Sequence, residues 1–231
     1  MKRIMLKASG ESLKGNKEFG FDDSIIKELV DQISKVMKNK NEVLLLVGGG
    51  NFLRGADLSH IDRYKADMIG MMSTMLNGVY LAEIFKNSGI KTVVYGTFEC
   101  ADIVYKFNKD EILDRLKEGY LVLLVGGTGH PFFTTDTGVV LRAIELNCDE
   151  VLLAKNIDYV YDSDPAKNKD AKPYKEISFD EYLAKDLKVI DTTSVILAKN
   201  NNMVLKLFSN KIKDGITKTV GGENLGTIMK N

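Results

Sequence analysis

The chain has 231 residues, 44% of them hydrophobic, which is enough for one globular domain with a sizeable core. The chain has 32 basic residues (lysine and arginine) and 32 acidic residues (aspartate and glutamate), so its formal net charge is zero. It therefore has no overall positive charge that would attract nucleic acid or an anionic membrane. The two cysteines, Cys100 and Cys148, have no metal-ligand spacing and indicate a reducing compartment. Because no stretch has the pattern of a signal peptide or a membrane span, we expect a cytoplasmic protein without a membrane or nucleic-acid partner.

Apolar runs and helical periodicity alternate through the first 150 residues. The pattern predicts a loop over Ala8–Gly20 and a helix that Asp22 or Asp23 caps. The other helices are expected at Asp62–Asn87 and Lys109–Lys117. Strands are expected at Lys2–Lys7, Glu42–Val47, Thr92–Tyr95 and Leu121–Val125.

The helix over Asp62–Asn87 carries a stripe of methionines at Met68, Met71, Met72 and Met75. Flexible thioethers at helical spacing are more typical of a core or a subunit interface than of a cofactor site. The stripe therefore predicts a packed helix face, either inside the fold or between copies.

The second part of the chain begins with a strand at Glu150–Ala154 and a polar turn at Asp164-Pro165, followed by a lysine-rich loop to Lys175. Short helices at Ser178–Ala184, Thr192–Lys199 and Ile216–Val220 accompany a strand at Val204–Phe208, and Thr227–Met229 is expected to close a sheet edge. The alternation predicts an α/β protein, a three-layer αβα sandwich with a mainly parallel central sheet. We expect one domain, 1–231, whose parts 1–150 and 151–231 share that sheet.

The stretch Leu121–Asp136, LVLLVGGTGHPFFTTD, has the features of a ligand-binding strand–loop–helix unit. Its buried strand ends in glycines, which allow peptide N–H groups to approach phosphates closely. Aromatic rings and threonine hydroxyls follow, and Asp136 is expected to cap a helix over Thr137–Leu146. The combination predicts a nucleotide site.

Three strands end in glycine-containing loops, at Lys7–Gly10, Gly48–Gly55 and Gly126–Asp136. None has the P-loop sequence, and none has the dinucleotide fingerprint with its downstream acid. Several separate loops suit a substrate with several phosphates, or two phosphorylated substrates that face each other. Lys7 could supply a cation and Arg54 a guanidinium fork, and Asp136 could orient Lys7 or hold magnesium.

The chain resembles the bacterial uridylate kinases (UMP kinases) of the amino acid kinase family nearly end to end. The resemblance is carried by KxSGE at Lys7–Glu11, GGGNxxRG at Gly48–Gly55, IGMM at Ile69–Met72, MLNG at Met75–Gly78, GTGxPFFTTD at Gly127–Asp136 and the pair Asp164-Pro165. It implies an αβα sandwich without a P-loop, ATP with Mg2+ as phosphoryl donor and UMP as acceptor. It also implies a homohexamer that GTP activates and UTP inhibits.

Carried over residue by residue, the resemblance assigns roles to individual positions. The residues that match ATP-binding positions are Lys7, Ala8, Ser9, Gly10, Gly50, Arg54, Lys155, Asn156, Tyr161 and Asp164. Those that match UMP-binding positions are Gly49, Asp67, Thr128, Gly129, His130, Pro131, Phe132, Phe133, Thr134 and Thr135. Lys7, Arg54, Asp136 and Asp191 correspond to groups at the reaction centre, and the GTP segment corresponds to Gly15, Asn16, Lys17, Glu18, Phe19 and Gly20.

The sequence departs from the family at several of these positions. Where the family commonly reads Lys-Ala-Thr-Asn-Val-Asp-Gly, this chain has LAKNIDY, so Lys155 replaces a hydroxyl and Tyr159 replaces a glycine. His130 stands where the family often has asparagine, and a histidine can also titrate. These departures affect individual contacts rather than the class of ligand.

The predicted reaction is in-line transfer from ATP·Mg to the phosphate of UMP, which needs no general base because the acceptor oxygen is already ionised. One alternative is an acylphosphate-forming relative acting on an amino acid, which would need a small carboxylate pocket. Another is a non-catalytic nucleotide- or oxyanion-binding protein on the same fold. The combination of Lys7, Arg54 and Asp136 favours the enzyme.

Overall fold

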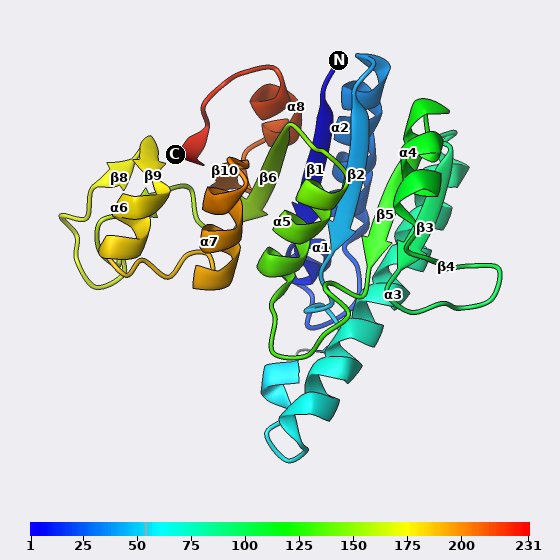
Figure 1. The fold of residues 1–231 in the computed structure, drawn as a ribbon, viewed down its shortest axis with the longest axis horizontal. Helices are drawn as coiled ribbons and strands as arrows, with labels where there is room; N and C mark the ends of the chain where they lie inside the picture. The colour runs from blue at the N-terminus through cyan, green and yellow to red at the C-terminus, as the bar shows by residue number, and fades with distance from the viewer. Residues whose placement is uncertain (54) are drawn as a thin grey trace.

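The computed structural model describes residues 1–53 and 55–231, and it has one nine-stranded sheet as its central layer (Figure 1). The strand order is β4-β3-β5-β2-β1-β6-β10-β11-β9. The strands are β1 (Arg3–Ala8), β2 (Glu42–Val47), β3 (Thr92–Gly96), β4 (Tyr105–Lys106), β5 (Leu121–Val125), β6 (Glu150–Lys155), β9 (Glu176–Ser178), β10 (Val204–Ser209) and β11 (Gly226–Lys230). All neighbouring pairs are parallel except β10 with β11.

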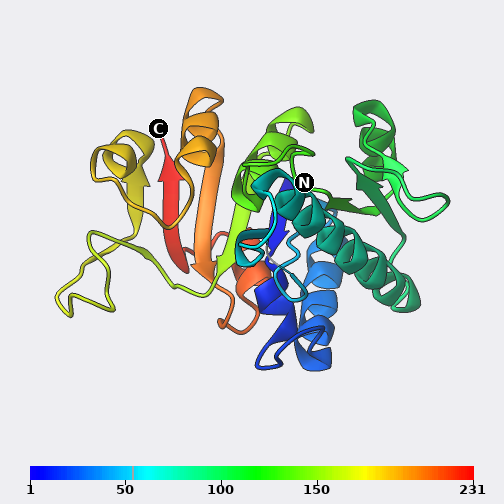
Figure 2. The same ribbon diagram turned by 90° about the horizontal axis from the view of Figure 1, so that it is seen from below.

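Helices cover both faces of the sheet, as the view along its edge shows (Figure 2). One core contains side chains of α1 (Gly10–Lys14), α2 (Asp23–Lys38), α3 (Arg63–Asn87) and α8 (Gly215–Val220). The other contains side chains of α4 (Lys109–Lys117), α5 (Thr135–Glu145), α6 (Phe179–Ala184) and α7 (Thr192–Asn200). The three-layer α/β sandwich that the sequence predicts is therefore confirmed.

Because β1 is pleated, its side chains alternate between the two helical layers on either face of the sheet. Ile4 and Leu6 belong to the core under α2, whereas Met5 between them belongs to the core under α5. Because side chains alternate between the faces of a strand, Lys7 is directed to the same side as Met5. The last polar residue of β1 is thus presented to the N-terminal end of α5.

Several expected elements have different bounds or partners in the structure. The expected loop Ala8–Gly20 contains α1, because Ser9 caps a helical turn by accepting from Ser12 N–H. The segment Thr227–Met229 was expected at a sheet edge, but β11 is covered by β9, so that expectation was wrong. Some short elements were not predicted from the sequence: the strands β4, β7 (Val160–Tyr161), β8 (Pro173–Tyr174) and β9, and the 3-10 turn Gly55–Asp57.

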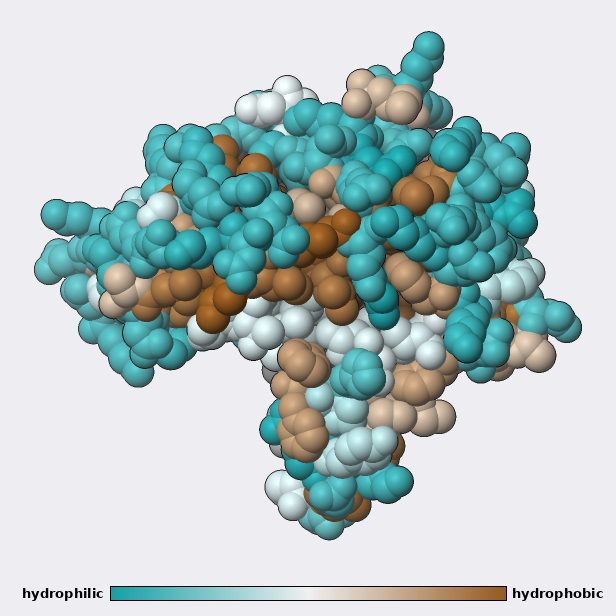
Figure 3. Space-filling model, viewed as in Figure 1, coloured by the Kyte–Doolittle hydropathy of each residue, from teal (hydrophilic) through white to brown (hydrophobic). Residues whose placement is uncertain are grey.

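Helix α3 is long and partly exposed. Its 25 residues are long and apolar enough for a membrane span by length and composition, although no such stretch was expected from the sequence. The helix is nevertheless part of the fold, since Leu81, Ala82 and Phe85 pack in the core under the sheet. Its N-terminal part stands away from the body (Figure 1), and the surface there mixes apolar and polar residues (Figure 3).

The methionine stripe is divided between the interior and the surface. Met75 packs against the core, while Met72 is 63% exposed and Leu76 is 52% exposed. Ile69, Met72 and Leu76 follow helical spacing and form an exposed apolar stripe along α3.

Gly78 lies where α3 packs against β5, and it provides a test of this packing. A Cβ at Gly78 would lie 2.2 Å from Cγ1 of Val125 on β5. Gly78→Ala should therefore lower the free energy of unfolding by about 1–3 kcal/mol, because overpacking outweighs the roughly 1 kcal/mol that alanine gains in a helix. Urea titration would measure this, with the exposed Glu83→Ala on the same helix as control. An unchanged or increased stability of Gly78→Ala would contradict the packing.

Candidate active site

The glycine loops that the sequence analysis singled out meet at the carboxyl ends of four neighbouring strands. β1 continues into Ser9 and Gly10, β2 into Gly48–Gly50, β5 into Gly126–Gly129 and β6 into Asn156. The first two loops touch directly, because a Cβ on Gly10 would lie 2.4 Å from the backbone nitrogen of Gly50. Only glycine permits this approach, which places many peptide groups around one space.

Three charged side chains are joined at the centre of these loops. The ammonium group of Lys7 donates to Oδ1 of Asp136 at 2.6 Å, and that of Lys155 donates to Oδ2 of the same carboxylate at 2.7 Å. Lys155 also donates to the backbone carbonyl of Val189 at 2.6 Å. We call Lys7, Asp136 and Lys155 the lysine–aspartate triad. Its side chains are largely buried, with 9%, 11% and 17% of their surfaces exposed.

The protonation of the triad follows from burial and from the charges within it. Burial opposes ionisation of Asp136, but the two ammonium groups outweigh it and hold the pKa of this carboxyl below its usual value. Burial lowers the pKa of Lys155, and the charge of Asp136 offsets part of that effect. An ionised Asp136 between two ammonium groups leaves the triad with one net positive charge, which suits a site for an anion.

Asp136 does not cap a helix, contrary to the sequence analysis. Helix α5 begins at Thr135, and its cap is Thr134, whose hydroxyl oxygen accepts from Asp136 N–H at 3.0 Å. Asp136 lies in the first turn instead, where its side chain reaches the two lysines. The prediction was wrong because a threonine two residues earlier performs the capping and leaves the carboxylate available.

Asp191 lies beside the triad as the N-cap of α7. Its carboxylate accepts from the hydroxyls of Thr134 at 2.7 Å and Thr137 at 2.9 Å, and from Ser194 N–H at 2.9 Å. Although burial opposes ionisation, these hydrogen bonds lower the pKa of Asp191. Asp191 therefore holds the end of the β5–α5 loop in place from the other half of the chain.

One cavity of about 390 Å³ opens between the β2 and β5 loops and α3. Its lining includes Lys7, Gly10 and the predicted ligand residues Gly49, Gly50, Asp67, Thr128, His130, Phe133, Thr134 and Thr135. The sequence-based set of acceptor residues is thus largely brought together. Phe132 does not line this cavity; its ring is 66% exposed.

The β5–α5 loop is anchored to α3 through Asp67. Oδ2 of Asp67 accepts from Phe132 N–H at 2.8 Å, and Arg63 donates to both carboxylate oxygens. Phe132 adopts a left-handed backbone with φ of 71°, which is uncommon for a residue other than glycine. Strained backbone of this kind is frequent in ligand-binding loops. The Arg63 guanidinium lies 6.0 Å from the centre of the Phe132 ring.

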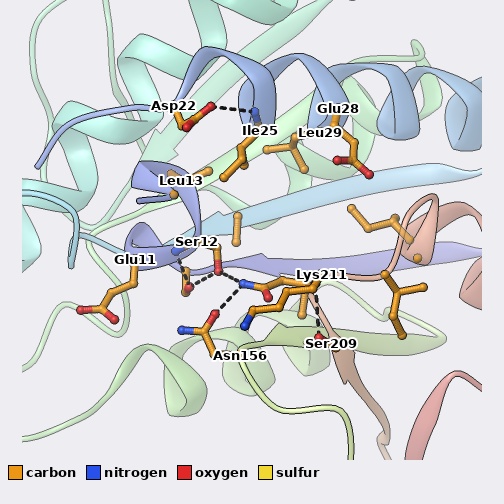
Figure 4. Close-up of a pocket in the computed structure, with 18 of the residues that line it drawn as sticks. Glu11, Ser12, Leu13, Asp22, Ile25, Glu28, Leu29, Asn156, Ser209 and Lys211 are labelled. Atoms are coloured by element: carbon orange, nitrogen blue, oxygen red, sulfur yellow. Dashed lines mark hydrogen bonds between the residues drawn. The ribbon is translucent and has the colours of Figure 1, made fainter. Parts of the chain in front are cut away.

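A second cavity of about 670 Å³ adjoins the first at Lys7 and Ser9 and extends between α1, α2 and the segment after β10 (Figure 4). Apolar side chains such as Leu29 and Phe208 line one part of it. Polar groups line another part, where Asn210 donates from Nδ2 to Ser12 Oγ at 2.6 Å and to Asn156 Oδ1 at 2.8 Å. The buried Oδ1 of Asn210 has no hydrogen-bond partner among the residues that the structure describes. A partly apolar space with an unpaired acceptor, next to a net positive charge, suits the base and sugar of a nucleotide.

Other predicted site residues lie apart from these cavities. Tyr161 lies on β7 and donates to Asp158, and Asp164 caps the turn at Ala166 N–H; neither lines either cavity. Arg54 lies outside the described residues. Most of the expected regulatory segment is exposed, including Phe19 at 68%, but its first residues, Gly15 and Asn16, line the larger cavity.

A buried amide pair that was not predicted from the sequence supports the β2 loop. Asn51 and Asn77, 2% and 0% exposed, exchange two hydrogen bonds between their amides, at 2.9 and 2.6 Å. Asn77 also donates to Gly48 O at 2.6 Å, and Asn51 donates to Gly20 O at 3.0 Å. Thr74, one turn earlier on α3, accepts from Gly126 N–H at 2.7 Å. The polar residues within the apolar pattern of α3 were the available signal.

The described carboxylates do not form a direct magnesium site. Both oxygens of Asp136 are bonded to lysines, both oxygens of Asp191 are bonded to hydroxyls, and no three His, Cys, Asp or Glu side chains come together in residues 1–53 and 55–231. Mg2+ prefers a few carboxylates together with phosphate oxygens and water.

Comparisons with known proteins agree with this geometry. The sequence profile of the amino acid kinase family matches residues 2–209. The fold matches a UMP kinase from Bacillus anthracis with a TM-score of 0.95 at 30% identity, covering 99% of this chain and 96% of that one. It matches a UMP kinase from Ureaplasma parvum with a TM-score of 0.94 at 35% identity, covering 100% and 99%. A uridylate kinase from Archaeoglobus fulgidus gives a TM-score of 0.75 at 25% identity, covering 99% and 100%.

Proposed function

Because the chain belongs to the amino acid kinase family, we propose that it is a UMP kinase, which transfers the γ-phosphate of ATP to UMP and gives UDP for pyrimidine nucleotide biosynthesis. The observation that carries the proposal is the cavity that Gly49, Asp67 and residues of the β5–α5 loop line together with Lys7. Similarity to proteins described as UMP kinases, over their full lengths, supports the choice of acceptor.

The acceptor UMP would occupy this smaller cavity. The threonine hydroxyls and loop N–H groups offer donors and acceptors to a uracil edge, and Phe133 offers an apolar wall. A phosphate directed toward the triad would meet Lys7 and the backbone of Gly49 and Gly50. This arrangement fits an acceptor that is itself a phosphate better than one with a small carboxylate.

The donor ATP would occupy the larger cavity, with its phosphates over Lys7–Gly10 and its nucleoside toward Asn156 and Asn210. The two cavities share Lys7, Ser9 and Glu11, so the two phosphate groups would meet at the triad. Lys7, Arg54 and backbone N–H groups would hold the two polyanions in line, and Mg2+ would arrive with ATP. An ionised acceptor oxygen requires no base, so the task of the protein is positioning and neutralisation of charge.

Regulation and assembly are also part of the proposal. The segment Gly15–Gly20 would carry the response to GTP, with UTP as inhibitor, because it borders the larger cavity and is hydrogen-bonded through Gly20 to Asn51. The exposed stripe at Ile69, Met72 and Leu76 would be covered by a second copy of the chain in a homo-oligomer, a hexamer by the resemblance.

The role of Lys7 is tested by its removal. Lys7→Ala should give a folded protein with about 10²- to 10³-fold lower turnover, the effect of losing one well-placed transition-state donor. Steady-state kinetics with a coupled assay of ADP release would measure the loss. The exposed Lys117→Ala, on α4, is the matched control. Near-normal turnover of Lys7→Ala would refute the role.

The choice of acceptor is tested by a series of substrates. Uracil and cytosine differ by exchanged donors and acceptors at one ring edge, and each buried mismatch costs about 1–3 kcal/mol. Two mismatches amount to a preference of roughly a thousandfold for UMP over CMP. We expect ADP release with UMP, little with CMP and none with AMP or glutamate. Equal use of CMP and UMP would show that the β5–α5 loop does not select the base, and activity on glutamate alone would favour the acylphosphate-forming class.

Assembly is tested by sedimentation. We expect a multimer at micromolar concentration, because a second copy would remove the apolar stripe of α3 from water. Met72→Lys together with Leu76→Lys should shift the species toward a monomer, while Glu83→Lys on the same helix should not. A monomeric wild type at this concentration would refute the proposed interface.

A further inference from the structure

The charge of the lysine–aspartate triad differs from that of a simple ion pair. Lys7 and Asp136 alone would be a neutral pair, whose field at a nearby phosphate largely cancels. The ammonium of Lys155 on the second oxygen of Asp136 restores one net positive charge. A site that binds two polyphosphates needs a net positive charge, since opposite charges attract strongly where water is partly excluded.

Strand register explains how Lys155 reaches Asp136. Lys7 of β1 pairs with Leu153 of β6, so Lys155 lies two residues further along, on the same face of the sheet. That face is covered by α5, whose first turn carries Asp136. Lys155 is therefore fixed from three directions: by the sheet, by Asp136 and by the carbonyl of Val189.

Burying the ammonium group of Lys155 costs free energy, which suggests that its charge has a function. Burial lowers the pKa of Lys155, and a buried cation is generally tolerated only when it is paired. Lys7 occupies only Oδ1 of Asp136, and a neutral hydrogen-bond donor would satisfy Oδ2 without adding a second buried charge.

We propose that Lys155 is a charge-balancing residue of the phosphate site: its ammonium offsets Asp136, so that Lys7 presents its full positive charge to the polyphosphate of the donor. This inference rests on the proposed function for the identity of the donor, but it concerns the sign of the site and applies to any polyphosphate there. Lys155 acts through Asp136 and Lys7, so it is a positioning residue rather than a group that must touch the substrate.

The role predicts a specific pattern of polyphosphate affinity. Lys155→Gln keeps a polar group beside Val189 but leaves the triad neutral. We expect it to weaken binding of ATP without Mg2+ about 10- to 100-fold. Lys155→Arg keeps the charge and should bind within a few-fold of the wild type. Adding Asp136→Asn to Lys155→Gln restores the net positive charge and should recover most of the lost affinity.

Isothermal titration calorimetry in EDTA would measure these affinities for wild type, Lys155→Gln, Lys155→Arg and the Asp136→Asn/Lys155→Gln double variant. Inorganic tripolyphosphate is the second ligand, which removes contributions of the base and sugar. Lys117→Gln, on the exposed face of α4, is the matched control for loss of one positive charge. Thermal melts establish that each variant is folded.

A structural role for Lys155 makes the opposite prediction, because Asp136→Asn would then disturb the site further. Unchanged polyphosphate affinity in Lys155→Gln, or failure of the double variant to recover affinity, would overturn the proposal. If Lys155→Gln does not fold, weak binding by Lys155→Arg would do the same. These outcomes are separate from the proposed function: a wild type that binds polyphosphate but does not phosphorylate UMP would refute UMP as acceptor and leave the charge balance intact.

Discussion

The buried carboxylate of Asp136 is the interaction on which the arrangement of the site depends. It joins the end of β1, the start of α5 and the end of β6 through two lysines. Removing one partner of a buried ion pair is costly, because the remaining charge has lost its water. The three elements are thereby held in one relative position, and the glycine loops that follow the strands are positioned with them.

Its partner Lys7 lies where the two cavities meet. Lys7 lines both of them, and Thr134, which caps α5, is bonded to Asp191 at the start of α7. The β5–α5 loop is therefore attached at one end to the triad and to α7, and at Phe132 to Asp67 on α3. Contacts from both parts of the chain fix this loop, so its strained backbone at Phe132 is supported on two sides.

Much of the fold was predictable because its strands are buried on both faces and carry continuous apolar runs. Glu42–Val47, Leu121–Val125 and Lys109–Lys117 were predicted with the bounds that the structure has. The strands missed were the two- and three-residue ones, such as β7 and β9, which are too short to show a period. Their pairing depends on tertiary neighbours such as Thr227, whose hydroxyl accepts from Val160 N–H.

Site residues that belong to one sequence motif were predictable. Contacts between strands that are distant in the sequence, such as β1 and β6, were less so. The proximity of Lys7 to Asp136 was anticipated as one option, because both lie at loop ends. The second lysine on Asp136 could not be derived, since it requires the register of β1 with β6 and the rotation of the first turn of α5. Asn51 and Asn77 were also missed: a single polar residue in an apolar helix gives no indication of its partner 26 residues away.

The amide pair of Asn51 and Asn77 also connects the segment Gly15–Gly20 to the β2 loop. Gly20 N–H donates to Asn51 O while Asn51 Nδ2 donates to Gly20 O, so the end of the exposed segment Gly15–Gly20 is fixed to the β2 loop by two hydrogen bonds. Asn77 continues the connection to Gly48 and to α3. Leaving a group of this buried amide pair without a partner would cost about 1–3 kcal/mol. A displacement of Gly20 therefore cannot remain local: it either breaks bonds in a buried network or moves the β2 loop, which lines the smaller cavity. The segment that borders the larger cavity is in this way mechanically connected to the smaller one.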